Sequence, residues 1–441
     1  MKTTSTAVVF RATLAAFIVL VIATVIISFT KTASNNAASC AVPEQPCIMK
    51  TIFGLNGEAT IEKIDTVRLS AEVTGAIGNG LEWIAAAQSP DGGWGAGSYT
   101  RQNVMDPHKV SPDPATTAIV SIALLRTGNT LTEGKFSPQL KQATLFLLKA
   151  VEQWRDDQPR LTILEETQPQ RKLGQNIDAI LTAQYFTTLL KYPQHKDWND
   201  RVKQALAKCV TRIEKEQDSD GGWKGGGWAP VLQSALADNA LESAKDAGIA
   251  VDSVVMANSK NYQKSNFDTA TKSAVTGKAA GVMLYSLSGT TRSSAKEAKK
   301  AKDVLANAKK EGKLADKDEL SEVNLVRAGV SPAQAQEMIA AYNINESSKR
   351  EALKEDVMYG FGSNGGEEFL SYLMTGESIL VQGAGNEWDQ WYSSMSKKIV
   401  QIQNNNGSWN GHHCITSPVF CTAACLLILS VQNDMQLAVS N

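Results

Sequence analysis

The sequence predicts an all-α fold in which an outer helix followed by an inner helix repeats about six times around a ring. Three observations support this prediction. Apolar residues recur with a helical period of about 3.6 from residue 64 to residue 432, and no long window alternates as a strand does. The same phrase occurs three times, as LEWIAAAQSPDGGW, VTRIEKEQDSDGGW and SKKIVQIQNNNGSW. Each copy joins a charged segment to one that is rich in small and apolar residues.

The repeated phrase combines a helix end, a tight turn and a tryptophan. Each copy has a Gln at the helix end and a Trp six positions later: Gln88 and Trp94, Gln217 and Trp223, Gln403 and Trp409. The Asp/Asn-Gly pair between them favours a turn, because Gly adopts positive φ and Asp or Asn bonds its own backbone. The Trp can bury a large area against the preceding helix if its indole N–H finds an acceptor, for which the Gln is a candidate. Three copies with one spacing indicate a repeated helical unit.

The N-terminal segment differs from the rest of the chain. Lys2 and Arg11 precede an apolar run whose length is slightly below the roughly 20 residues that span a bilayer. Basic residues before such a run predict a cytoplasmic start. No convincing small-x-small cleavage site directly follows Phe29, which favours an uncleaved anchor, and a cleaved signal peptide is the alternative. We predict a cytoplasmic tail, a transmembrane signal anchor, a polar linker and an extracytoplasmic helical domain at residues 1–11, 12–30, 31–63 and 64–441.

The helical domain follows one pattern in chain order. Segments before each turn carry charges on one face, as 197–216 does, and are predicted to be outer helices. Segments after each turn, at 115–125, 229–237 and 417–429, are predicted to be enclosed inner helices. The Ala- and Lys-rich stretch 293–320 is predicted to be an exposed helix of an irregular unit. The periodic patterns place helices at about 68–88, 114–127, 137–154, 173–191, 197–216, 229–247, 250–264, 276–289, 295–311, 331–343, 346–358, 364–382, 386–404 and 417–432.

Charge and cysteine content limit the classes of function. The 441 residues carry a net charge of −1 with both signs dispersed, so nothing indicates a nucleic-acid partner. The sequence contains no phosphate loop, HExxH, GxSxG or dinucleotide fingerprint. Its 6 cysteines suit disulfides outside the cytoplasm. Cys40 and Cys47 are the first candidate pair, and two free thiols are the alternative.

The three Gln-x-x-(Asp/Asn)-Gly-(Gly/Ser)-Trp turns and the segment HHCITSPVFCTA resemble bacterial prenyltransferase/squalene oxidase (QW) repeat proteins. These belong to the terpenoid cyclase and protein prenyltransferase superfamily. The resemblance covers about residues 64–432 and implies an α/α toroid. With the predicted anchor at 12–30, it implies a single-pass protein of the bacterial inner membrane with a periplasmic C-terminal domain. The turns are specific for the fold and say little about activity, because one fold hosts many functions.

The cyclase branch of this superfamily protonates an alkene with the middle acid of a DxDD motif, which precedes a Thr-Ala pair at the start of an inner helix. A buried, protonated carboxylic acid is what that step needs. When the helix starts are aligned on their Thr/Ser-Ala pairs, the donor position holds Ala115, Leu232 and Phe420. Asp113 matches an acid of the motif, but not the donor. The resemblance therefore does not extend to this chemistry.

The protein prenyltransferases of the superfamily hold zinc with Asp, Cys and His, and this chain has a dense cluster of such residues before and within its last helix. The cluster comprises His412, His413, Cys414, Cys421 and Cys425. Three interpretations stay open. The cysteines form a disulfide or are buried thiols; His412, His413, Cys414 and Cys421 bind zinc; or His413, Cys414 and Cys421 include a catalytic Cys–His pair. The spacing matches no standard zinc module, and both histidines could be exposed turn residues.

A second group of polar and aromatic residues is a candidate ligand site. Glu367, Glu368 and Tyr372 lie on the predicted inner helix 364–382, and Trp228 precedes another inner helix. They could line a pocket. Alternatively, the two Glu cap the helix start through its dipole and the aromatic residues belong to the core.

Two functions are compatible with these observations. The first is a membrane-anchored, non-catalytic binding or scaffold protein of the cell envelope, with a peptide, lipid or envelope protein as partner. The alternative is an enzyme that acts on an isoprenoid or other apolar substrate through the cluster 412–425, with zinc as the candidate cofactor.

Overall fold

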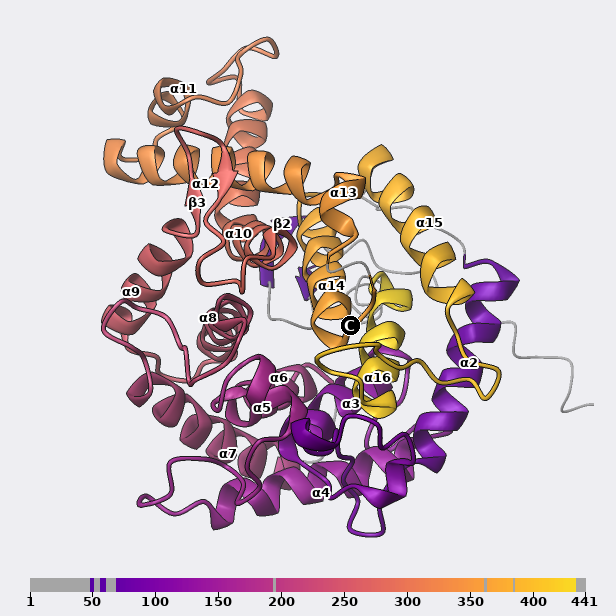
Figure 1. Ribbon diagram of the computed structural model, residues 1–441. Helices are drawn as coiled ribbons and strands as arrows, with labels where there is room; N and C mark the ends of the chain where they lie inside the picture. The colour runs from indigo at the N-terminus through magenta and orange to yellow at the C-terminus, as the bar shows by residue number, and fades with distance from the viewer. Residues whose placement is uncertain are drawn as a thin grey trace, which may run out of the picture. The chain divides into compact units, whose positions relative to one another are not determined.

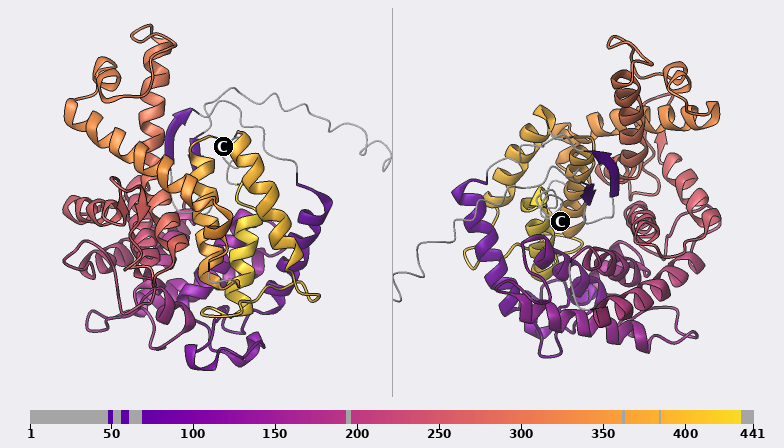
Figure 2. Two further views of the ribbon diagram at one scale, coloured as in Figure 1. Left: turned by 45° about the horizontal axis from the view of Figure 1, so that its top comes forward. Right: turned by 180° about the vertical axis from the view of Figure 1, so that it is seen from behind.

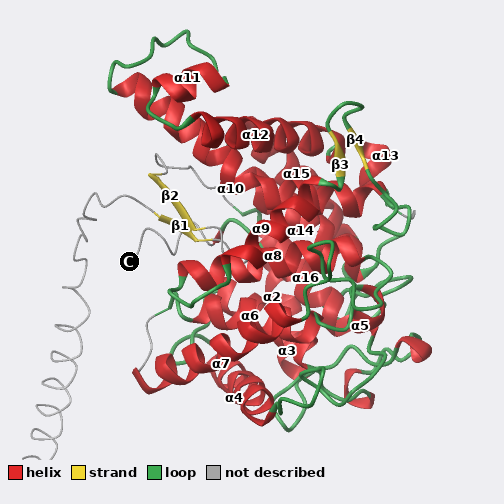
Figure 3. Cartoon of the chain, turned by 90° about the vertical axis from the view of Figure 1, so that its left-hand side faces the viewer, coloured by secondary structure: helices red, strands yellow, loops and turns green. Residues whose placement is uncertain are grey.

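Helices make up nearly all the regular structure of the computed structural model (Figures 1 and 3), so the predicted all-α fold is confirmed. The structure describes residues 48–50, 56–60, 69–192, 196–360, 363–383 and 385–433. None of the helices in these ranges combines the length and the apolar character that a membrane span requires. The predicted tail, the anchor at 12–30, most of the linker and the pair Cys40–Cys47 lie outside the described residues.

Six helices of the described residues form an inner layer (Figure 1). Each of them is buried where it packs against its neighbours in this layer. Each contacts the next in chain order, and the last contacts the first, so that the contacts close a circle. Most of their side chains are apolar or small, because other helices enclose them. These helices also bury charged residues, such as Arg126, Arg292 and Glu377, which form ion pairs with one another. They are α3 (Pro114–Arg126), α6 (Ile177–Leu189), α8 (Pro230–Asp246), the first half of α10 (Met283–Lys310), α14 (Gly366–Val381) and α16 (Pro418–Leu429).

An outer layer of amphipathic helices packs on this inner layer. Outer and inner helices alternate along the chain, and each outer helix turns its charged face to solvent. The outer helices are α2 (Ala71–Ala86) on α16, α4 (Ser137–Gln153) on α3, α7 (Lys196–Lys215) on α6, α9 (Ser253–Lys264) on α8, α12 (Pro332–Ala352) on α10 and α15 (Asn386–Gln401) on α14. The remaining elements are short: η1 (Tyr99–Arg101), η2 (Pro107–Lys109), α5 (Gln168–Lys172), α11 (Glu322–Arg327), α13 (Glu355–Met358), and the antiparallel pairs β1 (Ile48–Lys50) with β2 (Asn56–Thr60) and β3 (Phe267–Asp268) with β4 (Ser273–Ala274).

The tryptophans of the three repeated turns are fully buried, and each makes the same hydrogen bond. The indole N–H donates to a backbone carbonyl ten residues earlier: Trp94 to Ile84 at 2.8 Å, Trp223 to Ile213 at 2.7 Å and Trp409 to Ile399 at 2.8 Å. The expectation that the Gln side chain accepts this bond is therefore wrong. A carbonyl of the preceding helix lies nearer, because the Trp folds back along that helix.

The glutamines instead fasten each turn to the next outer helix. The Gln88 amide donates to its own turn at Gly92 O (2.8 Å) and to α4 at Gln139 O (2.9 Å). The Gln217 amide likewise donates to Val255 O of α9 at 2.9 Å. The Gln403 amide reaches Ala76 of α2 at 2.9 Å, which ties the last turn to the first outer helix. The repeated Gln thus positions consecutive pairs of helices and also connects the two ends of the helical domain.

The turn glycines are required by this docking. Gly92, Gly221 and Gly407 have φ of 91°, 87° and 91°. A Cβ at these positions would lie 2.7, 2.3 and 2.6 Å from a backbone oxygen of the adjacent outer helix. Both the backbone conformation and the close approach therefore exclude a side chain.

The alignment of helix starts on their Thr/Ser-Ala pairs is confirmed. The hydroxyls of Thr117, Ser234 and Thr422 each accept the backbone N–H of the preceding repeat tryptophan, at 2.9, 2.8 and 2.9 Å. These three residues therefore occupy equivalent places at the starts of α3, α8 and α16.

The region 276–352 departs from the prediction. Two helices expected at 276–289 and 295–311 form the single helix α10. Gly289 does not end it, because this Gly does not adopt the positive φ that ends a helix. It faces α8, where a Cβ would make an ordinary contact with Ala235 at 3.4 Å. The ends of α10 and α12 with α11 form their own small cluster around Ala301, Leu325 and Met338 (Figure 2). The stretch 293–320 is thus half covered by α12 rather than wholly exposed.

Candidate functional site

The start of α14 and the loop before α16 are joined by backbone hydrogen bonds and together carry the densest group of reactive side chains. The N–H of Gly366 donates to Ile415 O at 3.0 Å, and the N–H of His412 donates to Asn364 O at 2.7 Å. The N–H of Ile415 in turn donates to the carboxyl of Glu367 at 3.1 Å. These bonds place Glu367 beside residues that follow it by more than forty positions in the sequence.

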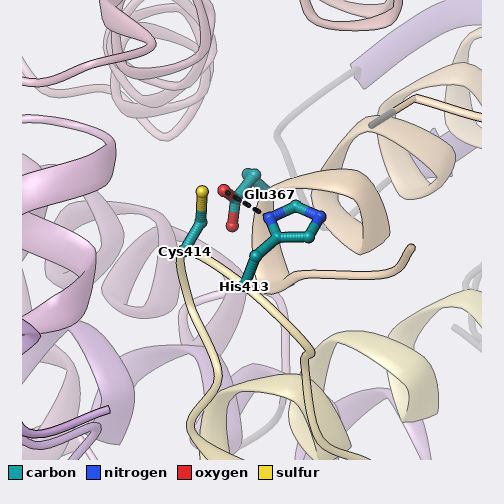
Figure 4. Close-up of side chains that lie close together, drawn as sticks. All are labelled: Glu367, His413 and Cys414. Atoms are coloured by element: carbon teal, nitrogen blue, oxygen red, sulfur yellow. Dashed lines mark ion pairs between the residues drawn. The ribbon is translucent and has the colours of Figure 1, made fainter. Parts of the chain in front are cut away.

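Glu367, His413 and Cys414 bring three potential metal donors together. One carboxylate oxygen, one imidazole nitrogen and the Cys sulfur lie within 4.8 Å of one another. Figure 4 shows the Glu367 carboxyl between the thiol and the ring, with its oxygen 3.9 Å from His413 Nδ1. The His413 side chain is 23% exposed, so the group borders solvent. Zinc binds these donor types.

The His413 ring is oriented by its other nitrogen. Nε2 lies 2.8 Å from the backbone oxygen of Ser363, which can only accept a hydrogen bond. In a neutral ring the proton is therefore on Nε2, and Nδ1, which faces Glu367, carries the lone pair. The carboxyl of Glu368 lies 3.7 Å from the same Nε2. A backbone carbonyl or carboxylate behind the ring is the usual arrangement for a ligating His.

Glu367 and Glu368 are both buried, and burial raises the pKa of each carboxyl. For Glu367 the neighbouring Glu368 and the Cys414 thiol raise the pKa further, so it lies well above its ordinary value. For Glu368, hydrogen bonds from Tyr285 and from the N–H of Gly365, together with the charge that His413 carries when it is protonated, oppose the effect of burial on the pKa. Two adjacent buried carboxyls of this kind retain a proton at a pH where exposed Glu is ionised.

The two Glu have different structural roles. Glu368 accepts the N–H of Gly365 at 2.8 Å, so the interpretation that it caps α14 is confirmed. Glu367 does not cap its own helix in this way and faces the loop before α16. Glu368 also accepts a hydrogen bond from the hydroxyl of Tyr285, a residue of α10.

Two glutamines that the sequence did not mark hold the loop that carries Cys414. Gln102 donates its side-chain amide to Cys414 O at 2.7 Å, and the Gln168 oxygen accepts the N–H groups of Thr416 at 2.8 Å and Ser417 at 3.0 Å. Cys414 has a φ of 59°, a left-handed conformation that costs a non-Gly residue roughly 1–2 kcal/mol. The loop is therefore held in a strained form by residues more than 240 positions earlier.

The other members of the predicted cluster lie apart from this group. The His412 side chain is exposed, and Cys421 donates its buried thiol to Ile415 O at 3.3 Å. Burial raises the pKa of Cys421 and Cys425 well above the ordinary value, so both stay protonated. The structure does not place His412 and Cys421 in the metal-donor set that was expected to include them. Among the described cysteines, Cys209, Cys414, Cys421 and Cys425 are free thiols, which matches the buried-thiol interpretation for the last two.

The remaining predicted ligand residues have structural partners or lie at the surface. The Tyr372 hydroxyl donates to Met358 O at 2.8 Å and accepts from Lys398 at 3.1 Å. Trp228 is 51% exposed just before α8. The three positions that correspond to the cyclase donor, Ala115, Leu232 and Phe420, are fully buried core residues.

Asp113 is a helix cap, and it has a buried acidic neighbour that sequence reasoning missed. Its carboxyl accepts the N–H groups of Thr116 at 2.7 Å and Ala96 at 2.8 Å. Asp178 of α6 accepts from the N–H of Ala115 at 3.1 Å. Burial raises the pKa of Asp113 to about 6, and burial with the charge of Asp113 raises the pKa of Asp178 to about 7.

Comparison of the chain with protein-family models, with curated proteins and with solved structures finds no match. Its function is therefore inferred from the geometry described above.

Proposed function

We propose that Glu367, His413 and Cys414 bind a zinc ion with an open coordination position, and that the protein is an enzyme that uses this centre. The observation that carries the proposal is the meeting of three different zinc-type donors within 4.8 Å. Zinc–ligand bonds of about 2.0–2.3 Å keep any two ligand atoms of one ion within about 4.5 Å. Small side-chain movements would therefore bring the three donors to one ion.

Three protein ligands leave a fourth position for water or substrate, which is typical of catalytic zinc. A zinc ion at such a position lowers the pKa of a bound water or thiol, or polarises a carbonyl. The chain's own residues fit the surrounding shell. Ser363 O fixes the His413 ring, Glu368 lies behind it, and Gln102 holds the backbone of Cys414.

The fold proposed for this centre is the α/α toroid of the QW-repeat proteins. It is supported by the closed order of contacts among the inner helices and by three turns with identical hydrogen bonds. The resemblance suggests an isoprenoid or other apolar compound as the substrate.

A non-catalytic binding or scaffold role is the second candidate. It is favoured by the fully buried Ala115, Leu232 and Phe420, which leave the cyclase donor positions without an acid. In this role the domain would bind a peptide or an envelope protein. In either role we propose an inner-membrane anchor at 12–30 and a periplasmic domain.

Metal analysis of protein purified without chelator tests the two candidates. We expect about one zinc per chain in the wild type and in Cys421→Ser, and little zinc in Cys414→Ser. Cys421→Ser is the matched control, because it changes a buried thiol outside the donor set. A folded wild type without zinc, or a Cys414→Ser variant that keeps it, would contradict the zinc centre and favour the scaffold role.

A further inference from the structure

Lys172, the last residue of α5, has its ammonium over two aromatic rings. Nζ lies 4.7 Å from the ring centre of Tyr99 and 4.0 Å from that of Trp228. The residue is only 3% exposed. Among the residues that the structure describes, no carboxylate or other acceptor bonds to this ammonium.

The absence of an anionic partner sets Lys172 apart. Every other buried Lys or Arg of the described residues pairs with a carboxylate. Lys349 is the closest comparison, because it is equally buried and its Nζ lies 3.1 Å from Glu346 and 2.9 Å from Glu387. The buried arginines pair in the same way: Arg126 and Arg292 with Glu377, and Arg212 with Asp156.

A desolvated ammonium is costly without a counter-charge. Two ring faces offset part of that cost through cation–π attraction. An incoming oxyanion would form charge-assisted hydrogen bonds with the ammonium and would not have to break an internal ion pair first.

The Lys172 cluster adjoins the proposed zinc centre through two shared segments. Gln168 lies one helical turn before Lys172 and bonds to Thr416 and Ser417 of the site loop. Tyr99 lies three residues before Gln102, which bonds to Cys414 O. The two segments that hold the site loop therefore also carry Lys172 and the ring of Tyr99.

The position of Trp228 is also built into the fold. The N–H of Ala229 donates to Lys172 O at 2.9 Å. A Cβ on Gly227 would lie 2.4 Å from Leu173 O, so only Gly allows the loop this close to the end of α5. The ring of Trp228 stays half exposed above the ammonium.

We propose that Lys172, Tyr99 and Trp228 form an oxyanion-binding subsite next to Glu367, His413 and Cys414. Its ligand is a carboxylate or phosphate group. The inference that this group belongs to the substrate rests on the proposed function. The inference that the subsite binds an anion is independent of it.

The test is a titration of the full-length chain with orthophosphate and, separately, with acetate at constant ionic strength, followed by calorimetry. We expect saturable binding of at least one anion by the wild type and binding weaker by about tenfold or more in Lys172→Met. Met keeps an apolar side chain of similar length beside the rings, so the variant should fold. Lys141→Met, which removes the same charge from the exposed face of α4, should bind as the wild type does.

The preferred anion identifies the group as phosphate or carboxylate. Equal affinity in Lys172→Met and wild type, or no saturable binding of either anion, would overturn the subsite. Zinc is measured in the same samples. Anion binding by zinc-free protein would reject the zinc centre and leave the subsite standing, and zinc-loaded protein without anion binding would do the opposite.

Discussion

Two pairs of buried acids lie at the starts of inner helices, and they differ in what surrounds them. Among the described residues, Asp113 and Asp178 accept hydrogen bonds from N–H, amide and hydroxyl groups, and both are buried in the core. Glu367 and Glu368 are as deeply buried, but they lie beside a partly exposed His413. Burial raises the pKa of all four. A raised pKa therefore does not identify a site here; mixed donor types with a route to solvent do.

The largest expected effect separates the two pairs by metal affinity. Glu367→Gln should lower zinc affinity by about 100-fold or more, because an amide is a much weaker zinc ligand than a carboxylate. Asp113→Asn should leave it unchanged, since Asp113 caps α3 and contacts none of the donors. Competition with a chromophoric chelator measures both. Equal losses in the two variants would mean that the effect is one of stability and would remove the distinction.

The second prediction concerns the pH dependence of stability in metal-free protein. The folded-state pKa values of Asp113, about 6, and Asp178, about 7, lie above the ordinary value near 3.9. Their contribution to stability is therefore full below about pH 4 and is lost as the pH rises through about 7. We expect a lower free energy of unfolding by urea at pH 8 than at pH 5, and a flatter dependence in Asp178→Asn.

Adding zinc should change how the free energy of unfolding depends on pH. Zinc binding requires Glu367 and Cys414 to lose their protons, so zinc affinity should rise with pH. Stabilisation by a fixed excess of zinc should therefore increase from pH 5 to pH 8, opposite in sign to the metal-free trend. Asp178→Asn should show the same gain from zinc as the wild type. A gain that does not depend on pH would show that neither proton is displaced.

The parts of this molecule that could be predicted from its sequence are those fixed by near neighbours. The helices, the turns of Trp94, Trp223 and Trp409 and the equivalence of Thr117 with Thr422 all follow from spacings of a few residues. The residue types of His413 and Cys414 likewise suggested zinc. Periodicity cannot show which distant segments meet, because that depends on how the helices pack.

The site illustrates this limit. The sequence predicts the site's third donor, Glu367, to be a ligand-site or capping residue and does not link it to Cys414. Gln102 and Gln168 gave no signal at all, since their partners lie more than 240 positions away. The continuity of α10 is a related case, because the sequence does not show that Gly289 lies within a helix packed on α8 rather than at a helix end.

The smallest predicted effect tests whether the site loop is held by one of those distant residues. Gln102→Leu removes the hydrogen bond to Cys414 O and keeps a side chain of similar size. Without it the strained φ of Cys414 can relax, so we expect zinc affinity to fall by about tenfold, within the range for groups that support metal ligands. Gln139→Leu is a suitable control, because the Gln139 side-chain oxygen has no partner among the described residues. If the two variants have the same thermal stability but only Gln102→Leu loses zinc affinity, Gln102 positions the thiol. If the zinc affinity of each variant changes only as its thermal stability changes, the loop keeps its conformation without Gln102. The contrast between the two acid pairs then rests on Glu367, His413 and Cys414 alone.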